Sequence, residues 1–276
     1  MSTLATGTGG ATGGTTTRTE LIGPEPAEAL AGLLDIAPPL ECVPPAWHWV
    51  YLLDRRPSAD LGHDGHPTSG VPAPPGPGRL RMFAGGRITE HTPLRFGAPA
   101  TRTTHVVSST EKQGRSGSLT FVTVRHTIEQ EGRPVVVDEQ DIVYRAPGTT
   151  LRTEAAVEAP AATPDCLQLQ VDNVLLFRFS ALTYNGHRIH YDHGYAAEEG
   201  YLGLVVHGPL QALLLRELFR RGGAPSTGHQ FAYRLVSPVF GDPLLTVRPV
   251  PDEEARAARV EDPAGRVTAT GSLCPI

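Results

Sequence analysis

The stretch from Phe179 to Leu215 holds most of the side chains that could perform acid–base chemistry. His187, His190 and His193 stand there at intervals of three, shortly after the amide side chain of Asn185. A neutral imidazole can accept and return a proton near pH 7, and an amide can hold and orient a water molecule. This loop is therefore a candidate site for moving protons to and from a substrate.

The residues after this loop predict the start of a helix. Gly208 suits the N-cap, Pro209 suits the first helical position, and Gly222 suits the stop. Free backbone N–H groups at a helix start can hold an oxygen that carries negative charge. Such a site beside an imidazole is the combination that enolate chemistry requires. Apolar residues recur at helical spacing along the predicted helix: Leu210, Leu213, Leu214 and Leu218.

Two strings in this stretch resemble the MaoC-like hydratase/dehydratase family. They are NGHRIHYD over 185–192 and GLVVHG over 203–208, and the likeness is strongest to its mesaconyl-CoA hydratase and hydroxyacyl-thioester dehydratase type 2 branch. The resemblance covers most of the chain from about Leu40 to the end. It implies an α+β double hotdog fold with two halves, each an antiparallel sheet wrapped on a central helix, the first half being degenerate. It also implies a cofactor-free hydro-lyase that hydrates a 2-enoyl thioester or dehydrates a 3-hydroxyacyl thioester.

The resemblance assigns catalytic roles to three residues. His190 would be the base, the backbone amide of Gly208 would bind the thioester oxygen, and Asn185 would hold the water. The wider family has an acidic residue at the position of Asn185, and an amide cannot carry a proton as a carboxyl group can. Either His190 moves both protons or a second group helps, for which Asp192 and His187 are candidates.

Further residues are expected to contact the substrate, although each has a structural alternative. Asp192 could instead cap a short helix over residues 193–199, and Arg188 could be an ion-pair partner. His207 could be a packed, hydrogen-bonded residue at the helix start. The acyl pocket of the first half could equally be ordinary core packing, including Trp47. The complete set of expected substrate contacts is Arg188, Asp192, His207, Val206, Tyr184, Met82 and Phe83.

The spacing of His187, His190 and His193 also raises the alternative of a zinc site. Zinc requires ligands that converge in a tetrahedron with a fixed second shell, and we predict no metal. Two other functions stay open because of Asn185 and the unknown substrate carrier. One is a thioester-binding protein that has lost catalysis, and the other is a carrier-protein dehydratase of secondary metabolism.

The chain of 276 residues divides into four predicted regions. Residues 1–19, rich in Thr, Gly and Ala, are expected to be a disordered tail, and residues 155–165 a linker. The first hotdog half would span 20–154 and the catalytic half 166–276. We expect helices over 24–36 and 209–221. The expected strands cover 87–93, 100–112, 119–130, 135–145, 167–177, 230–237, 244–250, 257–261 and 266–273.

Composition restricts the partners and the compartment. A net charge of -5 gives no sign of nucleic-acid binding. Three widely spaced cysteines fit reduced thiols in the cytoplasm, and there is no apolar run of the length that a membrane span needs. The expected partner is an acyl-CoA or an acyl-carrier-protein thioester. A homodimer formed through a free sheet edge stays open.

Overall fold

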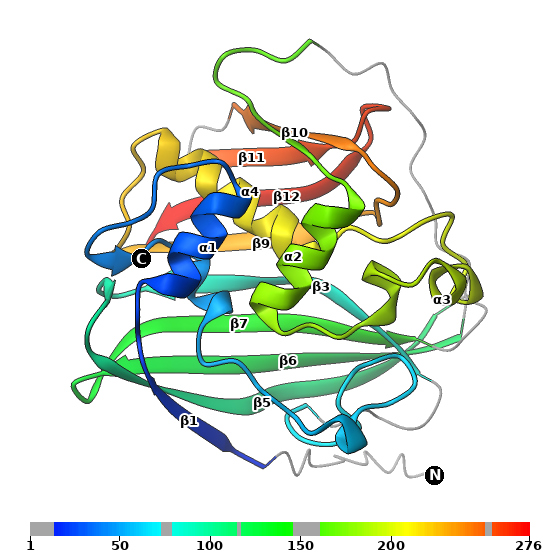
Figure 1. Cartoon of the computed structure of the whole chain (residues 1–276), viewed down its shortest axis with the longest axis horizontal. Coiled ribbons are helices and arrows are strands. Elements are labelled where there is room, and N and C mark those ends of the chain that lie inside the picture. Colours follow the sequence, from blue (N-terminus) through cyan, green and yellow to red (C-terminus); the bar gives the residue numbers. More distant parts are fainter. Residues whose placement is uncertain (1–13, 73–78, 115–116, 146–160, 252–255) are drawn as a thin grey trace, which may run out of the picture.

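A computed structural model describes residues 14–72, 79–114, 117–145, 161–251 and 256–276. Its main feature is a ten-stranded antiparallel sheet with the order β1-β5-β6-β7-β3-β9-β12-β11-β10-β8 (Figure 1). The two halves join where β3 pairs with β9, from Gly85 opposite Arg234 to Glu90 opposite His229. The strands are β1 Thr16–Leu21, β3 Leu80–Glu90, β5 Pro99–Gly114, β6 Gly117–Gln130, β7 Arg133–Arg145, β8 Leu167–Gln170, β9 His229–Leu235, β10 Leu244–Val250, β11 Arg256–Glu261 and β12 Val267–Pro275.

Both halves of the sheet repeat one layout. The first strand of each half, β1 or β8, lies at an outer edge, and a strand that precedes a three-stranded meander, β3 or β9, lies at the junction. The meanders β5-β6-β7 and β10-β11-β12 lie between. A small separate sheet pairs β2 (Cys42–Val43) with β4 (Leu94–Arg95). This repetition confirms the predicted double hotdog of the α+β class.

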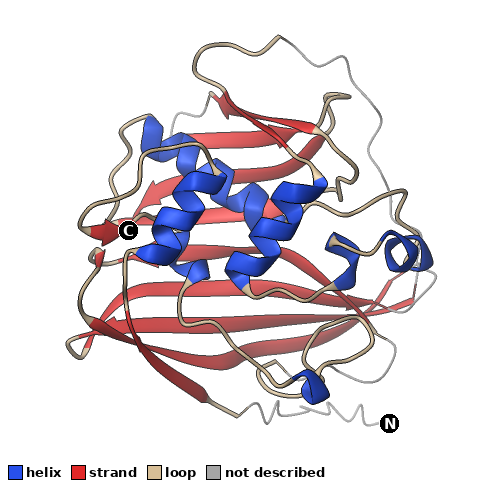
Figure 2. Cartoon of the chain, in the orientation of Figure 1, coloured by secondary structure: helices blue, strands red, loops and turns tan. Residues whose placement is uncertain are grey.

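The helices differ between the halves. The long helix α4 (Gly208–Arg221) packs on β9 to β12, and its residues from Leu210 to Phe219 are buried. The first half has the nine-residue α1 (Glu25–Leu33) and the short 3-10 helix η1 (Trp47–Val50). In Figure 2, α1, α2 and α4 all lie in front of the strands. The remaining helices are α2 Asn173–Thr183, α3 His193–Glu198, and the 3-10 turns η2 Ser58–Asp60 and η3 Arg188–His190.

Several sequence predictions need correction. The strand predicted over 167–177 ends at Gln170, because Asp172 accepts a hydrogen bond from the backbone N–H of Leu175 (2.7 Å) and so caps α2. Strand β3 begins at Leu80, seven positions before the predicted start. Helix α4 begins one residue early, with His207 as its N-cap and Gly208 as its first residue.

The predicted tail is wrong for residues 16–19. These residues belong to β1, which pairs with β5 from Thr16 opposite Thr104 to Leu21 opposite Pro99. Thr-rich sequence suits an edge strand, since β-branched side chains favour extended backbone. Residues 1–13 and most of the predicted linker lie outside the described residues, so the domain bounds stay a prediction. Among the described residues, no helix is long and apolar enough to cross a membrane.

Candidate active site

A cavity of about 1340 Å³ lies between the two halves. The first half contributes the loop of residues 61–69 and the start of β3, and the second half contributes the segment 183–191 and the start of α4. The volume is sufficient for an acyl group with part of a carrier arm. His190, Asn185 and Gly208 all line this cavity, so the structure brings the three predicted catalytic residues together.

His190 ends the 3-10 turn η3 and is 7% exposed. Its Nδ1 lies 2.7 Å from the carbonyl oxygen of Val205, which can only accept, so Nδ1–H donates and Nε2 keeps its lone pair. Burial lowers the pKa of His190 well below 6.5, helped by the neighbouring His207 and His187. The ring is therefore a neutral base near pH 7.

His207 packs against one face of the His190 ring. The two imidazoles are stacked at 18° with 3.6 Å between their centroids. His207 is fully buried, its Nε2 lies 2.8 Å from Oγ of Ser180 on α2, and burial lowers its pKa to about 3. His207 does not line the cavity. The structural alternative of a packed, hydrogen-bonded residue therefore describes it better than a substrate contact does.

Asn185 follows the end of α2, where Tyr184 adopts the left-handed conformation (φ 51°). The Oδ1 atom of Asn185 accepts a hydrogen bond from the backbone N–H of His187 (3.0 Å). Since this bond occupies the oxygen, the Nδ2 amide is the group left to face a ligand, and it can only donate. Asn185 can therefore donate to the oxygen of a water or hydroxyl group in the cavity.

Gly208 is the first residue of α4 and packs tightly. A Cβ atom there would lie 2.2 Å from Cδ1 of Leu235 and 3.3 Å from Cδ1 of Phe83. The Gly208 amide N–H donates to no atom of the residues that the structure describes. An unpaired N–H at the positive end of a buried helix is suited to hold an oxyanion.

Comparison with known sequences decides the family. The sequence model of hydroxyacyl-thioester dehydratase type 2 matches residues 46–241 of the chain. The chain belongs to this family. It is accordingly a hydro-lyase of thioester substrates, within the MaoC-like group that the strings around His190 and Gly208 resemble.

One curated relative and two solved structures illustrate how far the likeness extends. Mesaconyl-C(4)-CoA hydratase of Chloroflexus aurantiacus is 46% identical over 258 residues, which cover 90% of this chain and 91% of the relative. HtdX of Mycobacterium tuberculosis has a TM-score of 0.69 at 14% identity, covering 95% and 100% of the two chains. A second M. tuberculosis protein, described as a double hotdog fold, has a TM-score of 0.53 at 14% identity, covering 95% and 94%. These structures show a shared fold.

The predicted substrate contacts fall into two groups. Arg188 and Asp192 do not line the cavity: Nη2 of Arg188 lies 2.6 Å from Oδ2 of Asp192. Asp192 also caps α3 by accepting from the backbone N–H of Tyr195 (3.0 Å). Trp47 is buried in the core and Trp49 faces the cavity in its place. The contacts that do line the cavity are Tyr184, Val206, Met82 and Phe83.

Sequence reasoning missed the loop of the first half that forms part of the site. The loop of residues 61–68 is held against the histidine-rich loop, because the backbone N–H of Arg188 donates to the carbonyl oxygen of Asp64 (2.9 Å). Gly65 and Gly186 come so close that a Cβ on Gly65 would lie 1.9 Å from the Gly186 oxygen. The available signal was the Pro-, Gly-, Asp- and His-rich composition of residues 55–78, since long irregular loops often carry function.

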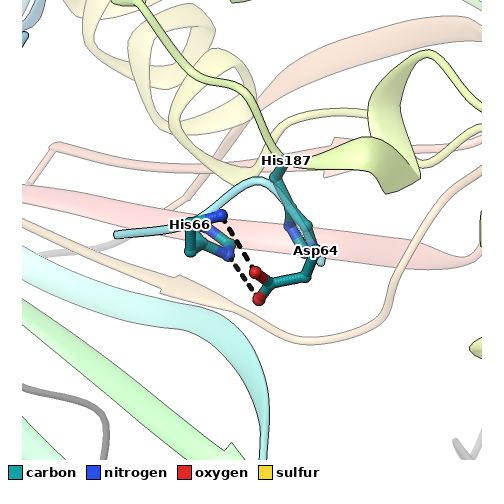
Figure 3. Close-up of side chains that lie close together, drawn as sticks. All are labelled: Asp64, His66 and His187. Atoms are coloured by element: carbon teal, nitrogen blue, oxygen red, sulfur yellow. Dashed lines mark hydrogen bonds and ion pairs between the residues drawn. The ribbon is translucent and has the colours of Figure 1, made fainter. Parts of the chain in front are cut away.

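This loop brings Asp64 and His66 next to His187 (Figure 3). Among the described residues these form the one group of three with possible metal-binding atoms within 4.8 Å of one another, and it is not the group that sequence spacing indicated. His66 already donates from its backbone N–H and its Nδ1 to the two Asp64 oxygens (2.9 and 3.1 Å). The described geometry is therefore a carboxylate–imidazole pair whose ring lies against His187, with 4.1 Å between the ring centroids and the ring planes tilted by 46°.

Charges in this pair are well defined. Burial acts to raise the pKa of Asp64, but hydrogen bonding and the charges of His66 and His187 outweigh it and lower the pKa to about 2. Burial lowers the pKa of His66 to about 3, despite its hydrogen bond with Asp64. Near neutral pH the cavity therefore holds a carboxylate at Asp64 and neutral rings at His66 and His190.

Proposed function

We propose that this protein reversibly hydrates a 2-enoyl thioester, with His190 as the base and the Gly208 amide as the oxyanion donor. The observation that carries the proposal is the position of both groups on one cavity, where neither reactive atom has a hydrogen-bond partner among the residues that the structure describes. The Nδ1–H bond to Val205 fixes the tautomer of His190, so that Nε2 is the accepting atom.

In the hydration direction, the thioester oxygen accepts a hydrogen bond from the Gly208 N–H. Nε2 of His190 takes a proton from water, and the resulting hydroxide adds to the β-carbon while the C=C electron pair forms the enolate. The N-terminal end of α4 stabilises the enolate oxygen, a contribution that is typically worth several kcal/mol in such sites. The proton on His190 then passes to the α-carbon, which restores the thioester and the neutral ring.

Asn185 supports this cycle as a water holder. Its Nδ2 amide donates to the water oxygen, which leaves the water protons directed at other acceptors, among them Nε2 of His190. Because the Asn185 amide does not gain or lose a proton near neutral pH, His190 moves both protons in this scheme. Dehydration follows the same steps in reverse, with His190 first removing the α-proton.

The first substrate to test is mesaconyl-C(4)-CoA, because the relative that is 46% identical is named for it. Crotonyl-CoA is the comparison, since it is a 2-enoyl thioester without a second acid group. Purified protein is incubated with each thioester, and the enoyl absorbance and the mass of the product are followed. Loss of absorbance with a gain of one water in mass supports the proposal. Absence of turnover with tight binding of either thioester would indicate a thioester-binding protein instead.

The carrier of the acyl group is tested separately. Rates on CoA and on carrier-protein thioesters of one acyl group are compared at equal concentration. A strong preference for the carrier-protein thioester would favour the carrier-bound dehydratase over a CoA enzyme. Metal content of the same sample is measured, and a stoichiometric divalent ion bound at Asp64, His66 and His187 would require a different scheme.

A further inference from the structure

Arg81 lies on β3 at the edge of the active-site cavity. Residues two apart on a strand face the same side, so Arg81 faces the side of Phe83, whose ring reaches the start of α4. The two positions are roughly 7 Å apart along the strand. The side chain of Arg81 thus belongs to the part of the cavity where the acyl group of a thioester bound at Gly208 would lie.

The guanidinium of Arg81 has no anionic partner within ion-pair distance among the residues that the structure describes. The acid acting on it is Asp64, but both oxygens of Asp64 accept hydrogen bonds from His66. Its cross-strand neighbour is Tyr144, whose pKa is raised by burial, so this phenol is neutral near pH 7. An arginine stays protonated even where burial lowers its pKa, as it does here.

This arrangement is unusual for the chain, because its other arginines at buried or part-buried positions mostly have partners. Arg87 and Arg125 both contact Glu139, and Arg216 lies 3.8 Å from Glu90. Among the cavity arginines, Arg56 bonds Asp54, and Arg79 donates to Ser118 and Thr120. Removing a cationic side chain from water without an anionic partner costs free energy, unless a ligand supplies the opposite charge.

Arg102 is the other cavity arginine without a hydrogen-bond partner among the described residues. The charges that act on it are those of Asp54, Arg18, Glu20 and Asp138, and none of the active-site histidines is among them. The charge of Arg81, in contrast, acts on His66, whose ring lies next to that of His187 and which interacts with His190. Arg81 is thus the unpaired cation on the side of the cavity that holds the base.

We propose that Arg81 binds a second, free carboxylate of the substrate, so that the preferred substrate is the monothioester of a short unsaturated dicarboxylic acid. This inference rests on the proposed hydration and names the residue that selects the acyl group. A mesaconyl group, which is a methylfumaryl group, carries such a carboxylate, whereas a crotonyl group ends in a methyl. A planar guanidinium can bind a carboxylate through two parallel hydrogen bonds.

The test compares both substrates across matched variants. Arg81→Gln removes the charge and keeps a polar, hydrogen-bonding side chain, although a shorter one, whereas Arg81→Lys keeps the charge. Arg102→Gln removes the other unpaired cavity arginine and serves as the control. We expect Arg81→Gln to lower kcat/KM for mesaconyl-C(4)-CoA by roughly 100-fold and to leave crotonyl-CoA within about threefold. Arg81→Lys should recover part of the loss, and Arg102→Gln should leave the ratio of the two substrates unchanged.

A binding measurement separates this inference from the catalytic proposal. Succinyl-CoA and butyryl-CoA are saturated and cannot be hydrated, and of the two only succinyl-CoA carries a free carboxylate. Calorimetric titration should show that Arg81→Gln lowers the affinity for succinyl-CoA by at least about tenfold and changes the affinity for butyryl-CoA little. Equal losses for both ligands, or no loss, would overturn the role of Arg81 even in an active enzyme. If Arg81→Gln weakens only the binding of succinyl-CoA, and the wild-type protein hydrates no enoyl thioester, the carboxylate site would be supported and the hydratase proposal refuted.

Discussion

His190 and His207 lie with their rings stacked, 3.6 Å apart between centroids and inclined by 18°. His207 is fixed by Ser180 and by its place as the N-cap of α4, so the stack ties the orientation of His190 to the start of that helix. The carbonyl oxygen of Val205 fixes the other side of His190 through Nδ1. The proposed base and the proposed oxyanion donor are therefore positioned by the same four-residue segment, 205–208.

Replacing His190 tests the base directly. His190→Gln can keep a hydrogen bond to Val205 but offers no basic nitrogen, so we expect kcat to fall by about 100-fold or more with a smaller change in KM. Steady-state rates of hydration with the preferred thioester provide the measurement. His193→Gln is the control, since His193 is exposed on α3 and does not line the cavity. Retained activity in His190→Gln, in a protein whose melting temperature is unchanged, would refute the assignment.

The pH dependence of kcat/KM should reveal the lowered pKa of His190. The base works when deprotonated, and its pKa in the folded protein lies well below 6.5, chiefly because of burial. The value of kcat/KM should therefore be constant between about pH 6 and pH 8 and should fall only at lower pH. A profile measured in buffers of constant ionic strength checks this. An inflection close to 6.5 would mean that the active ring is not the buried His190.

The residues of the second half were predictable because their chemistry is local in sequence. The 185–192 string, the apolar stripe of α4 and the meander strands each carry their own signal, and the structure confirms α4 to within one residue. An ion pair of Arg188, for which no partner was named, and a helix cap by Asp192 were predicted as the structural alternatives to substrate contacts. These were the alternatives that the structure selected.

Met82 and Phe83 of the first half were predicted and line the cavity, but the contributions of its loop and of Arg81 could not be predicted from sequence. Asp64 and His66 reach His187 across more than 120 positions, and no local pattern indicates which part of a long Pro- and Gly-rich loop is held against another loop. The role of Arg81 could not be predicted, because the side of the sheet that a strand residue faces is known only once the strand register is known. The error at residues 171–177 has a different cause, since Val and Leu suit a buried strand and a buried helix alike.

Helix α4 begins with a glycine because the space beside it is full. In Gly208→Ala the added Cβ would lie 2.2 Å from Cδ1 of Leu235, so either that side chain or the helix start must move. We expect kcat to fall by about tenfold or more, since small displacements of catalytic groups are costly, although alanine is the better helix former. The double variant Gly208→Ala with Leu235→Ala should regain part of the rate by removing the clash. Gly222→Ala, where Cβ would make ordinary contacts at 3.5 Å, is the control. An unchanged kcat in Gly208→Ala would show that the amide position is not critical.

The close approach of Gly65 to Gly186 can be tested against a matched glycine. Gly65 (φ +85°) and Gly97 (φ +75°) both adopt the left-handed conformation, so an alanine at either position should cost about 1 kcal/mol of unfolding free energy. A Cβ at Gly97 has nothing within 4 Å, whereas one at Gly65 would lie 1.9 Å from a backbone oxygen. Only Gly65→Ala should therefore displace the loop that holds Asp64 and His66 against His187.

We expect Gly97→Ala to keep wild-type kcat/KM and Gly65→Ala to lose about tenfold or more, because a shift of the order of 1 Å in a site is enough for such losses. Denaturant unfolding and hydration rates of both variants give the two readouts. Equal rates in both variants would mean that the first-half loop only covers the cavity. Equal losses of kcat/KM in both variants would show that backbone strain, and not the clash with Gly186, lowers the rate.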